Sequence, residues 1–182
     1  MMSLFKKILL IFTSWGVMFC HIAFADESTG AEMDFHGSLV AQPCWVNPDN
    51  AGHVVDMGDI PSSDLYSKPQ SKNINFTIVL SGCDFGGSGK GTVTTRFEGS
   101  ESPELPGYLA MSTANTGAAI GFMTQKGEKL ALGDESAPVE ISNGGNILNF
   151  IAYVQGEPTA IADRTIAIGD FTATTTFFLD YP

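Results

Sequence analysis

The last fourteen residues of the chain, 169–182, alternate between apolar and polar side chains. Successive side chains of a β-strand point to opposite faces, so residues two positions apart share a face. One face of the predicted strand carries Phe171, Ala173, Thr175, Phe177, Leu179 and Tyr181. The other face is polar except for Phe178. Such a strand buries one face, and it needs a neighbouring strand because a free edge exposes unpaired N–H and C=O groups.

The beginning of the chain predicts export. Two lysines precede an apolar stretch over residues 8–19, and residues 23–25, Ala-Phe-Ala, have the small-x-small form of a cleavage site. The stretch is short for a helix that crosses a bilayer, so we predict a cleaved secretory signal over residues 1–25. Loss of the two lysines would move the formal net charge from −11 to about −13. This acidity argues against nucleic acid and anionic lipid as partners, because both bind basic surfaces.

The cysteines predict a disulfide. Of the three cysteines, Cys20 would leave with the signal, and Cys44 and Cys83 would remain. An even pair in an oxidising compartment is typical of a disulfide. A metal site or a catalytic thiol is the alternative, but no His or second Cys cluster lies near either cysteine in the sequence. We therefore expect no metal and no cofactor at these residues.

The remainder of the mature chain is predicted to be nearly all β. Runs rich in Val, Ile, Phe and Thr are separated by clusters of Gly, Pro, Asn and Ser, which favours short strands joined by turns. No segment of a dozen residues has a convincing helical period with caps. About 157 residues suit one domain, and the spacing of the strands favours a β-sandwich. The predicted strands cover residues 39–46, 53–57, 74–80, 92–97, 108–111, 119–124, 147–154 and 169–181.

A second alternating segment stands near the mature amino terminus. Its apolar or glycine positions are Ala31, Met33, Phe35, Gly37 and Leu39, and its intervening positions are polar. The plainer interpretation is an ordinary first strand of the sandwich. The alternative is a detachable strand, because the segment lies just before Pro43 and Cys44, where the sandwich is predicted to begin. A detachable strand at one end and a free edge at the other would complement each other between molecules.

The sequence contains no pattern typical of an active site. The mature chain has two histidines, His36 and His53, and no His-x-x-x-His or Gly-x-Ser-x-Gly pattern. The glycine-rich run over residues 84–91 lacks the first glycine and the final Ser or Thr of a phosphate-binding loop. Trp45 could line a sugar site, although packing in the core or against the disulfide is favoured beside Cys44. We therefore predict a protein that is not an enzyme.

These features together resemble the pilus subunits of the chaperone–usher pathway of Gram-negative bacteria. Gly169 stands fourteenth from the end and Tyr181 is the penultimate residue, as in the carboxyl-terminal signature of that family. Residues 35–40 and the following Pro-Cys resemble a donor extension that leads into the first disulfide cysteine, and Cys83 stands where the second is expected. The segment 105–109 further resembles minor pilins of P and type 1 pili.

The resemblance implies an incomplete immunoglobulin-like β-sandwich that lacks its last strand. Residues 26–38 would form a donor-strand extension, and residues 39–182 the pilin domain. A periplasmic chaperone would first fill a groove beside the carboxyl-terminal strand, and the extension of a neighbouring pilus subunit would then replace it by donor-strand exchange. The groove and chaperone-binding residues would be Gly169, Phe171, Ala173, Thr175, Phe177, Leu179, Tyr181 and Pro182. An outer-membrane usher would be a further partner, and the subunit would end in the cell-surface fimbrium.

The function expected from the resemblance is that of a structural subunit of an adhesive pilus, in a minor or adaptor position. A pilus terminator is the first alternative, because residues 53–65 resemble that class. A sugar-binding adhesin of the same pathway is less favoured, since adhesins place a receptor domain before the pilin domain and lack a donor extension. A secreted β-sandwich enzyme is the third alternative, and the lack of an acid, base or metal cluster counts against it.

Overall fold

The computed structural model describes residues 42–46, 54–112 and 116–182, and all of them belong to one compact unit of the chain. The predicted signal and donor extension lie outside these residues. The described part is mostly β, as expected, and two helices of six residues each stand beside the strands. The elements are β1 (Trp45–Val46), α2 (Ser62–Ser67), β2 (Ile74–Cys83), a 3₁₀ turn (Gly86–Ser88), β3 (Lys90–Glu98), β4 (Leu109–Ala110), β5 (Ala118–Thr124), β6 (Lys129–Leu130), β7 (Val139–Ser142), β8 (Gly144–Gly156), α3 (Pro158–Asp163) and β9 (Thr176–Asp180).

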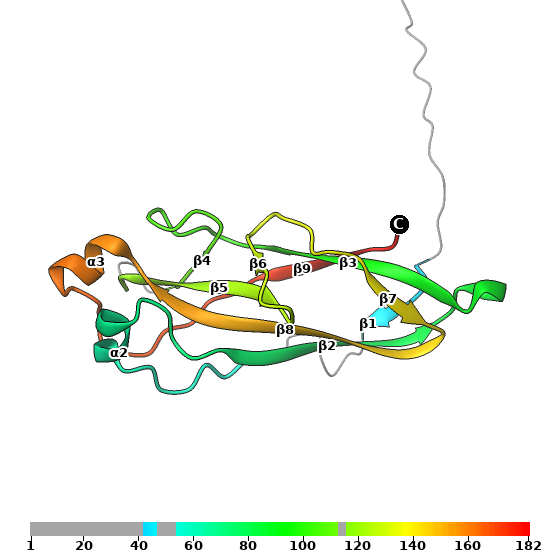
Figure 1. Cartoon of the computed structure of the whole chain (residues 1–182), viewed down its shortest axis with the longest axis horizontal. Coiled ribbons are helices and arrows are strands. Elements are labelled where there is room, and N and C mark those ends of the chain that lie inside the picture. The colour runs from blue at the N-terminus through cyan, green and yellow to red at the C-terminus, as the bar shows by residue number, and fades with distance from the viewer. Residues whose placement is uncertain (1–41, 47–53, 113–115) are drawn as a thin grey trace, which may run out of the picture. The chain divides into compact units, whose positions relative to one another are not determined.

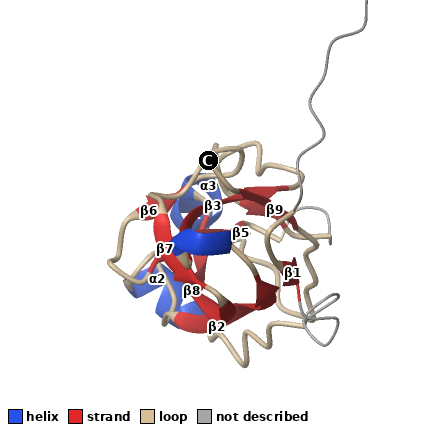
Figure 2. Ribbon diagram, turned by 90° about the vertical axis from the view of Figure 1, so that its right-hand side faces the viewer, coloured by secondary structure: helices blue, strands red, loops and turns tan. Residues whose placement is uncertain are grey.

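The strands form two antiparallel sheets that face each other. The larger sheet has the order β1-β2-β8-β5-β4, with β6 beside β5, and the smaller sheet has the order β7-β3-β9. Figures 1 and 2 show β3 and β9 stacked over β5, β8 and β2 as the second layer of a sandwich. Each sheet therefore has an edge strand near one side of the sandwich, β1 in one layer and β9 in the other (Figure 2).

Phenylalanine rings from both sheets form the centre of the core. The register of β2 and β8 places Phe76 opposite Phe150, so both side chains point to the same face of the larger sheet. From β3 in the smaller sheet, Phe97 stacks on Phe122 with ring centroids 4.7 Å apart and meets Phe150 edge-on at 5.2 Å. Such ring pairs stabilise a core beyond the area that they bury, by roughly 0.5–1.5 kcal/mol each.

The predicted disulfide between Cys44 and Cys83 is confirmed. The two Cα atoms lie 4.1 Å apart, and the bond joins the segment before β1 to the end of β2. Trp45 was expected to pack in the core or against the disulfide, but its side chain is 69% exposed. Its ring lies over Gly82, where an added Cβ would stand 3.2 Å from it. The core assignment of Trp45 is therefore wrong, because its strand position turns the ring to the outer face.

A second, smaller apolar cluster lies on the outer face of the larger sheet. Tyr153 is only 1% exposed although its neighbours on β8, residues 152 and 154, point into the main core. Tyr108 covers it edge-on, with centroids 6.1 Å apart and the two hydroxyl groups 3.2 Å apart. Gly121, directly opposite on β5, makes room, because a Cβ there would overlap the Tyr153 ring.

Four of the predicted strands, over 74–80, 92–97, 119–124 and 147–154, are present with extended ends. The predicted strand over 53–57 is wrong for its described residues, 54–57, which have no strand partner. Asp56 explains the difference, because its carboxylate accepts a hydrogen bond of 2.8 Å from the backbone N–H of Gly58. Gly58 has a φ of +63°, so the chain turns there instead of continuing a ladder.

The predicted strands at the two ends of the domain are shorter than expected. Of the segment 39–46, residues 42–46 are described and only Trp45–Val46 is strand. Of the segment 169–181, only Thr176–Asp180 is paired. No pattern in the sequence predicted β6, β7 or the two helices, because elements of two to six residues are too short for a period to appear.

Candidate functional site: an apolar groove beside the carboxyl-terminal strand

Among the described residues, the carboxyl-terminal strand β9 pairs with a strand on one side only. It pairs with β3 in a register that sets Phe177 opposite Phe97 and Leu179 opposite Thr95. Within the described ranges no strand lies along its other edge. The predicted alternation is present in three dimensions, since the odd residues from 171 to 181 are half-buried and the even residues are exposed. The odd face is thus directed at the core, yet it is not covered as a completed core would be.

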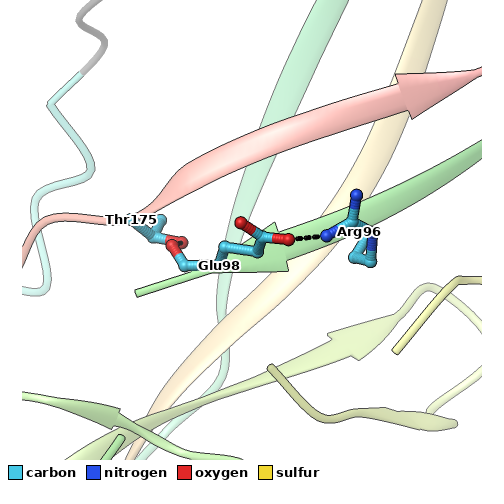
Figure 3. Close-up of polar contacts among 3 residues, drawn as sticks. All are labelled: Arg96, Glu98 and Thr175. Carbon is cyan, nitrogen blue, oxygen red and sulfur yellow. Dashed lines mark hydrogen bonds and ion pairs between the residues drawn. The ribbon is translucent and has the colours of Figure 1, made fainter. Parts of the chain in front are cut away.

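Residues 169–175 continue beyond β3 in an extended course that is held at separate points. The carbonyl of Thr172 accepts hydrogen bonds from the backbone N–H and the hydroxyl of Ser112, at 2.7 and 2.8 Å. The hydroxyl of Thr175 donates to the carbonyl of Glu98 at 2.9 Å, where β3 ends (Figure 3). Gly169 has a φ of +145°, a conformation that favours glycine. The signature glycine therefore stands where the chain enters this edge.

A groove of about 1350 Å³ runs along this segment. Residues 54–63 form one wall and residues 166–177 the other. The floor reaches the aromatic core, and it includes Phe76, Phe97, Leu109, Met111, Ile120, Phe122 and Val154. A core that opens directly into a groove is the arrangement expected of a sandwich in which one strand is missing.

The apolar side chains that border the groove are incompletely covered. At its rim, Ile168 is 92% exposed and Val54 is 84% exposed. Deeper in the groove, Met57, Ile60 and Phe171 pack against the core but are only partly buried. Apolar surface that is exposed along a groove is a marker of an interaction site. Together with the free backbone edge of β9, it is suited to bind an extended strand.

The penultimate residue, Tyr181, points inward from the same edge. Its hydroxyl is buried and has no hydrogen-bond partner among the described residues. Burial raises the pKa of the Tyr181 phenol, so the side chain is neutral at physiological pH. Pro182 follows it and is exposed. Tyr181 and Pro182 thus directly follow the end of β9 at Asp180.

The predicted donor residues 31, 33, 35, 37 and 39 lie outside the described part of the chain, so their role stays a prediction. Sequence reasoning missed the wall formed by residues 54–63. The available signal was the alternation of Val55 and Met57, which point inward, with exposed Val54 and Asp56. That alternation was attributed to a paired strand, whereas it belongs to an extended wall without a strand partner.

Nothing in the described part of the chain suggests catalysis at the groove. No group of three or more His, Cys, Asp or Glu side chains is placed to hold a metal ion in the ranges that the structure describes. In those ranges no helix is long and apolar enough to cross a membrane. The groove instead offers an apolar floor and an unpaired backbone edge, which are the requirements for strand addition.

Comparison with known proteins agrees with this geometry. Residues 33–182 match the family model described as fimbrial protein. The chain is 34% identical over 180 residues to the fimbria A protein of Serratia marcescens. The aligned residues cover 99% of each of the two chains. It is 31% identical over 163 residues to the fimbrial adapter PapK of Escherichia coli, covering 86% of this chain and 91% of PapK. The crystal structure of the P pilus rod subunit PapA matches with a TM-score of 0.67 and 27% identity, over 78% of this chain and all of PapA.

Proposed function

The chain belongs to the fimbrial protein family, and from that premise we propose that it assembles into an adhesive pilus by donor-strand exchange. Its family makes it a structural subunit of a fimbria and not an enzyme. In the proposed sequence of events, a periplasmic chaperone fills the groove with one of its own strands. At an outer-membrane usher, the amino-terminal extension of a neighbouring subunit replaces that strand.

The observation that carries the proposal is the groove that exposes the core beside a one-sided strand. A strand added there forms backbone hydrogen bonds to β9 and covers the half-buried odd face. Three apolar donor side chains, such as those of Met33, Phe35 and Leu39, would contribute about 5–9 kcal/mol at roughly 1.5–3 kcal/mol each, before entropy is subtracted. This amount is comparable with the whole stability of a typical domain.

The donor is proposed to be residues 26–38 with the adjoining Leu39. Its inward-facing positions would be Ala31, Met33, Phe35, Gly37 and Leu39. Gly37 would suit a shallow part of the groove, where the two backbones approach closely. The disulfide between Cys44 and Cys83 would anchor the start of the domain just after this extension.

The finer part of the proposal is a minor or adaptor position in the pilus. The likeness to the adapter PapK supports it. A rod position is the second candidate, because the PapA rod subunit matches the fold over its full length. Immunogold labelling of assembled pili separates the two. Sparse labels near one end are expected of an adaptor, and continuous labelling of the fibre would contradict that position.

Thermal unfolding tests the groove. Two oxidised forms of the mature chain, residues 26–182, are compared at low concentration, one of them with residues 28–41 attached after Pro182 through a flexible linker. The stabilisation of about 5–9 kcal/mol, at about 2–4 °C per kcal/mol, predicts a rise in Tm of roughly 10–35 °C. A linked strand of scrambled order serves as the control. A form without the strand that is already a stable monomer, and that gains nothing from either strand, would contradict the proposal.

A further inference from the structure

The groove is flanked by negative charge. Among its described lining residues are Asp56, Asp59 and Asp170, and that described lining contains no Lys, Arg or His. All three carboxylates are exposed at the rim. On β9, Asp180 is also exposed and shares the outward face of the even residues. A strand that enters the groove would therefore have carboxylates on both sides of its outward face.

The basic side chain in the part of β3 that pairs with β9 does not offset this charge. Arg96 lies on the outward face of β3, which is one strand in from the free edge. It forms an ion pair with Glu98 (Figure 3). Its guanidinium also covers the ring of Phe178, 4.8 Å from the ring centroid. Arg96 is thus already engaged by groups of this chain, and the free edge stays acidic.

The amino-terminal extension of this chain is acidic as well. Residues 26–41 contain Asp26, Glu27, Glu32 and Asp34 and neither Lys nor Arg. If the odd residues enter the groove, the two-residue period turns Glu32 and Asp34 outward. They would then face the same side as the rim carboxylates, on a strand that lies about 4.8 Å from the edge with which it pairs. Like charges on adjacent strands are destabilising.

We propose that this groove disfavours the extension of a second copy and selects a strand from a different polypeptide that is apolar on one face and basic on the other. The inference rests on the proposed function, since it requires that the groove bind a strand. Charge then decides which strand is bound, because the apolar face supplies affinity without identifying the partner. A subunit with this preference favours a different subunit over a second copy of itself as its donor.

The test uses the mature chain with Phe35→Asn, which removes the apolar anchor from its own extension. Three end-capped, fluorescent peptides of residues 28–41 are titrated into it at about 20 mM NaCl, where screening is weak. One has the native sequence, one carries Glu32→Gln and Asp34→Asn, and one carries Glu32→Lys and Asp34→Lys. We expect the native peptide to bind roughly three- to tenfold more weakly than the neutral peptide, and the basic peptide to bind most tightly.

Two controls assign the effect to the groove. At about 0.5 M NaCl the Debye length is only a few ångströms, and the three Kd values should agree within about twofold. The variant Asp56→Asn, Asp59→Asn, Asp170→Asn should remove the same differences at low salt. Asparagine can still accept the hydrogen bond that Asp56 receives from Gly58. An unchanged Kd for the neutral peptide shows that this variant has folded.

The outcomes separate this inference from the proposed function. If all three peptides bind with the same Kd at low salt, strand addition stands and the charge selection is wrong. If the order of the peptides persists in the triple variant, the selection does not come from these carboxylates and the inference is overturned. If no peptide binds although the chain is folded, the proposed function itself fails.

Discussion

Replacing Phe177 by alanine should reveal how much the missing strand contributes to the core. Phe177 lines the groove and lies opposite Phe97 in the β3–β9 ladder. Its side chain is only half-buried in the described structure, and a strand that fills the groove is expected to cover the rest. The cost of Phe177→Ala should therefore depend on whether the groove is occupied.

The magnitudes follow from burial. Truncating a fully buried Phe costs about 3–5 kcal/mol, which at 2–4 °C per kcal/mol lowers Tm by roughly 6–20 °C in the complemented protein. In the open form the same side chain is half-covered, so the cost should be about half as large. Phe178→Ala is the matched control. Phe178 is the next residue in the strand, and its ring is 40% exposed and contacts Arg96. Loss of that exposed contact should cost only about 0.5–1 kcal/mol in either form.

The assay is thermal unfolding, followed by circular dichroism, of both variants with and without a linked complementary strand. The account requires a larger cost of Phe177→Ala when the strand is present, and an equal cost of Phe178→Ala in both forms. Equal costs of Phe177→Ala in the two forms would refute the reasoning, because they would show that a strand in the groove does not cover this side chain.

Three further predictions concern the extension, the outer face and the disulfide. Phe35→Asn should block donation of the extension to a partner's groove in a pull-down, whereas His36→Asn, on the polar face, should preserve it. Gly121→Ala should lower stability by about 1–3 kcal/mol in denaturant unfolding, because its Cβ would overlap a buried tyrosine ring, whereas Gly87→Ala, which has open space, should change it little. Cys83→Ser should lower stability by about 4 kcal/mol, as expected for a disulfide whose cysteines are 39 residues apart.

Each of these predictions has a result that contradicts it. Equal loss of donation in the two extension variants would show that the apolar face does not enter the groove. If Gly121→Ala and Gly87→Ala were equally stable, the Tyr108 and Tyr153 side chains would repack around the added Cβ without loss of stability. If the Cys83→Ser variant were as stable as the oxidised protein, the disulfide would not stabilise the fold by restricting the conformations of the unfolded chain.

The alternation over residues 169–182 was the most informative part of the sequence. It correctly predicted which residues of this segment are half-buried and which are exposed in the structure. A period of two reports which face is covered, and it does not report whether a neighbouring strand is present. For this reason residues 169–175 were predicted as strand although they lie beyond the end of β3. The same ambiguity led residues 54–57 to be predicted as a paired strand, when they form a wall of the groove.

The disulfide could be predicted because removal of the predicted signal would leave a single pair of cysteines. The exposure of Trp45 could not be predicted, because it depends on the register of β1 against β2, which places Trp45 opposite Ser81. The groove itself also lay beyond sequence reasoning. Its walls come from segments more than one hundred residues apart, residues 54–63 and 166–177, and only the fold brings them together.

The central claim is that β9 has a free edge that a second strand completes. Hydrogen–deuterium exchange of the backbone amides of residues 171–181 measures this directly, in the mature chain with and without a linked strand. In the form without a linked strand, the account predicts rapid exchange of the backbone amides that point away from β3, toward the free edge. Exchange should slow by about tenfold or more, equivalent to at least about 1.4 kcal/mol, when the strand is linked. Full protection of this segment without any added strand, or exchange that the strand leaves unchanged, would contradict the account.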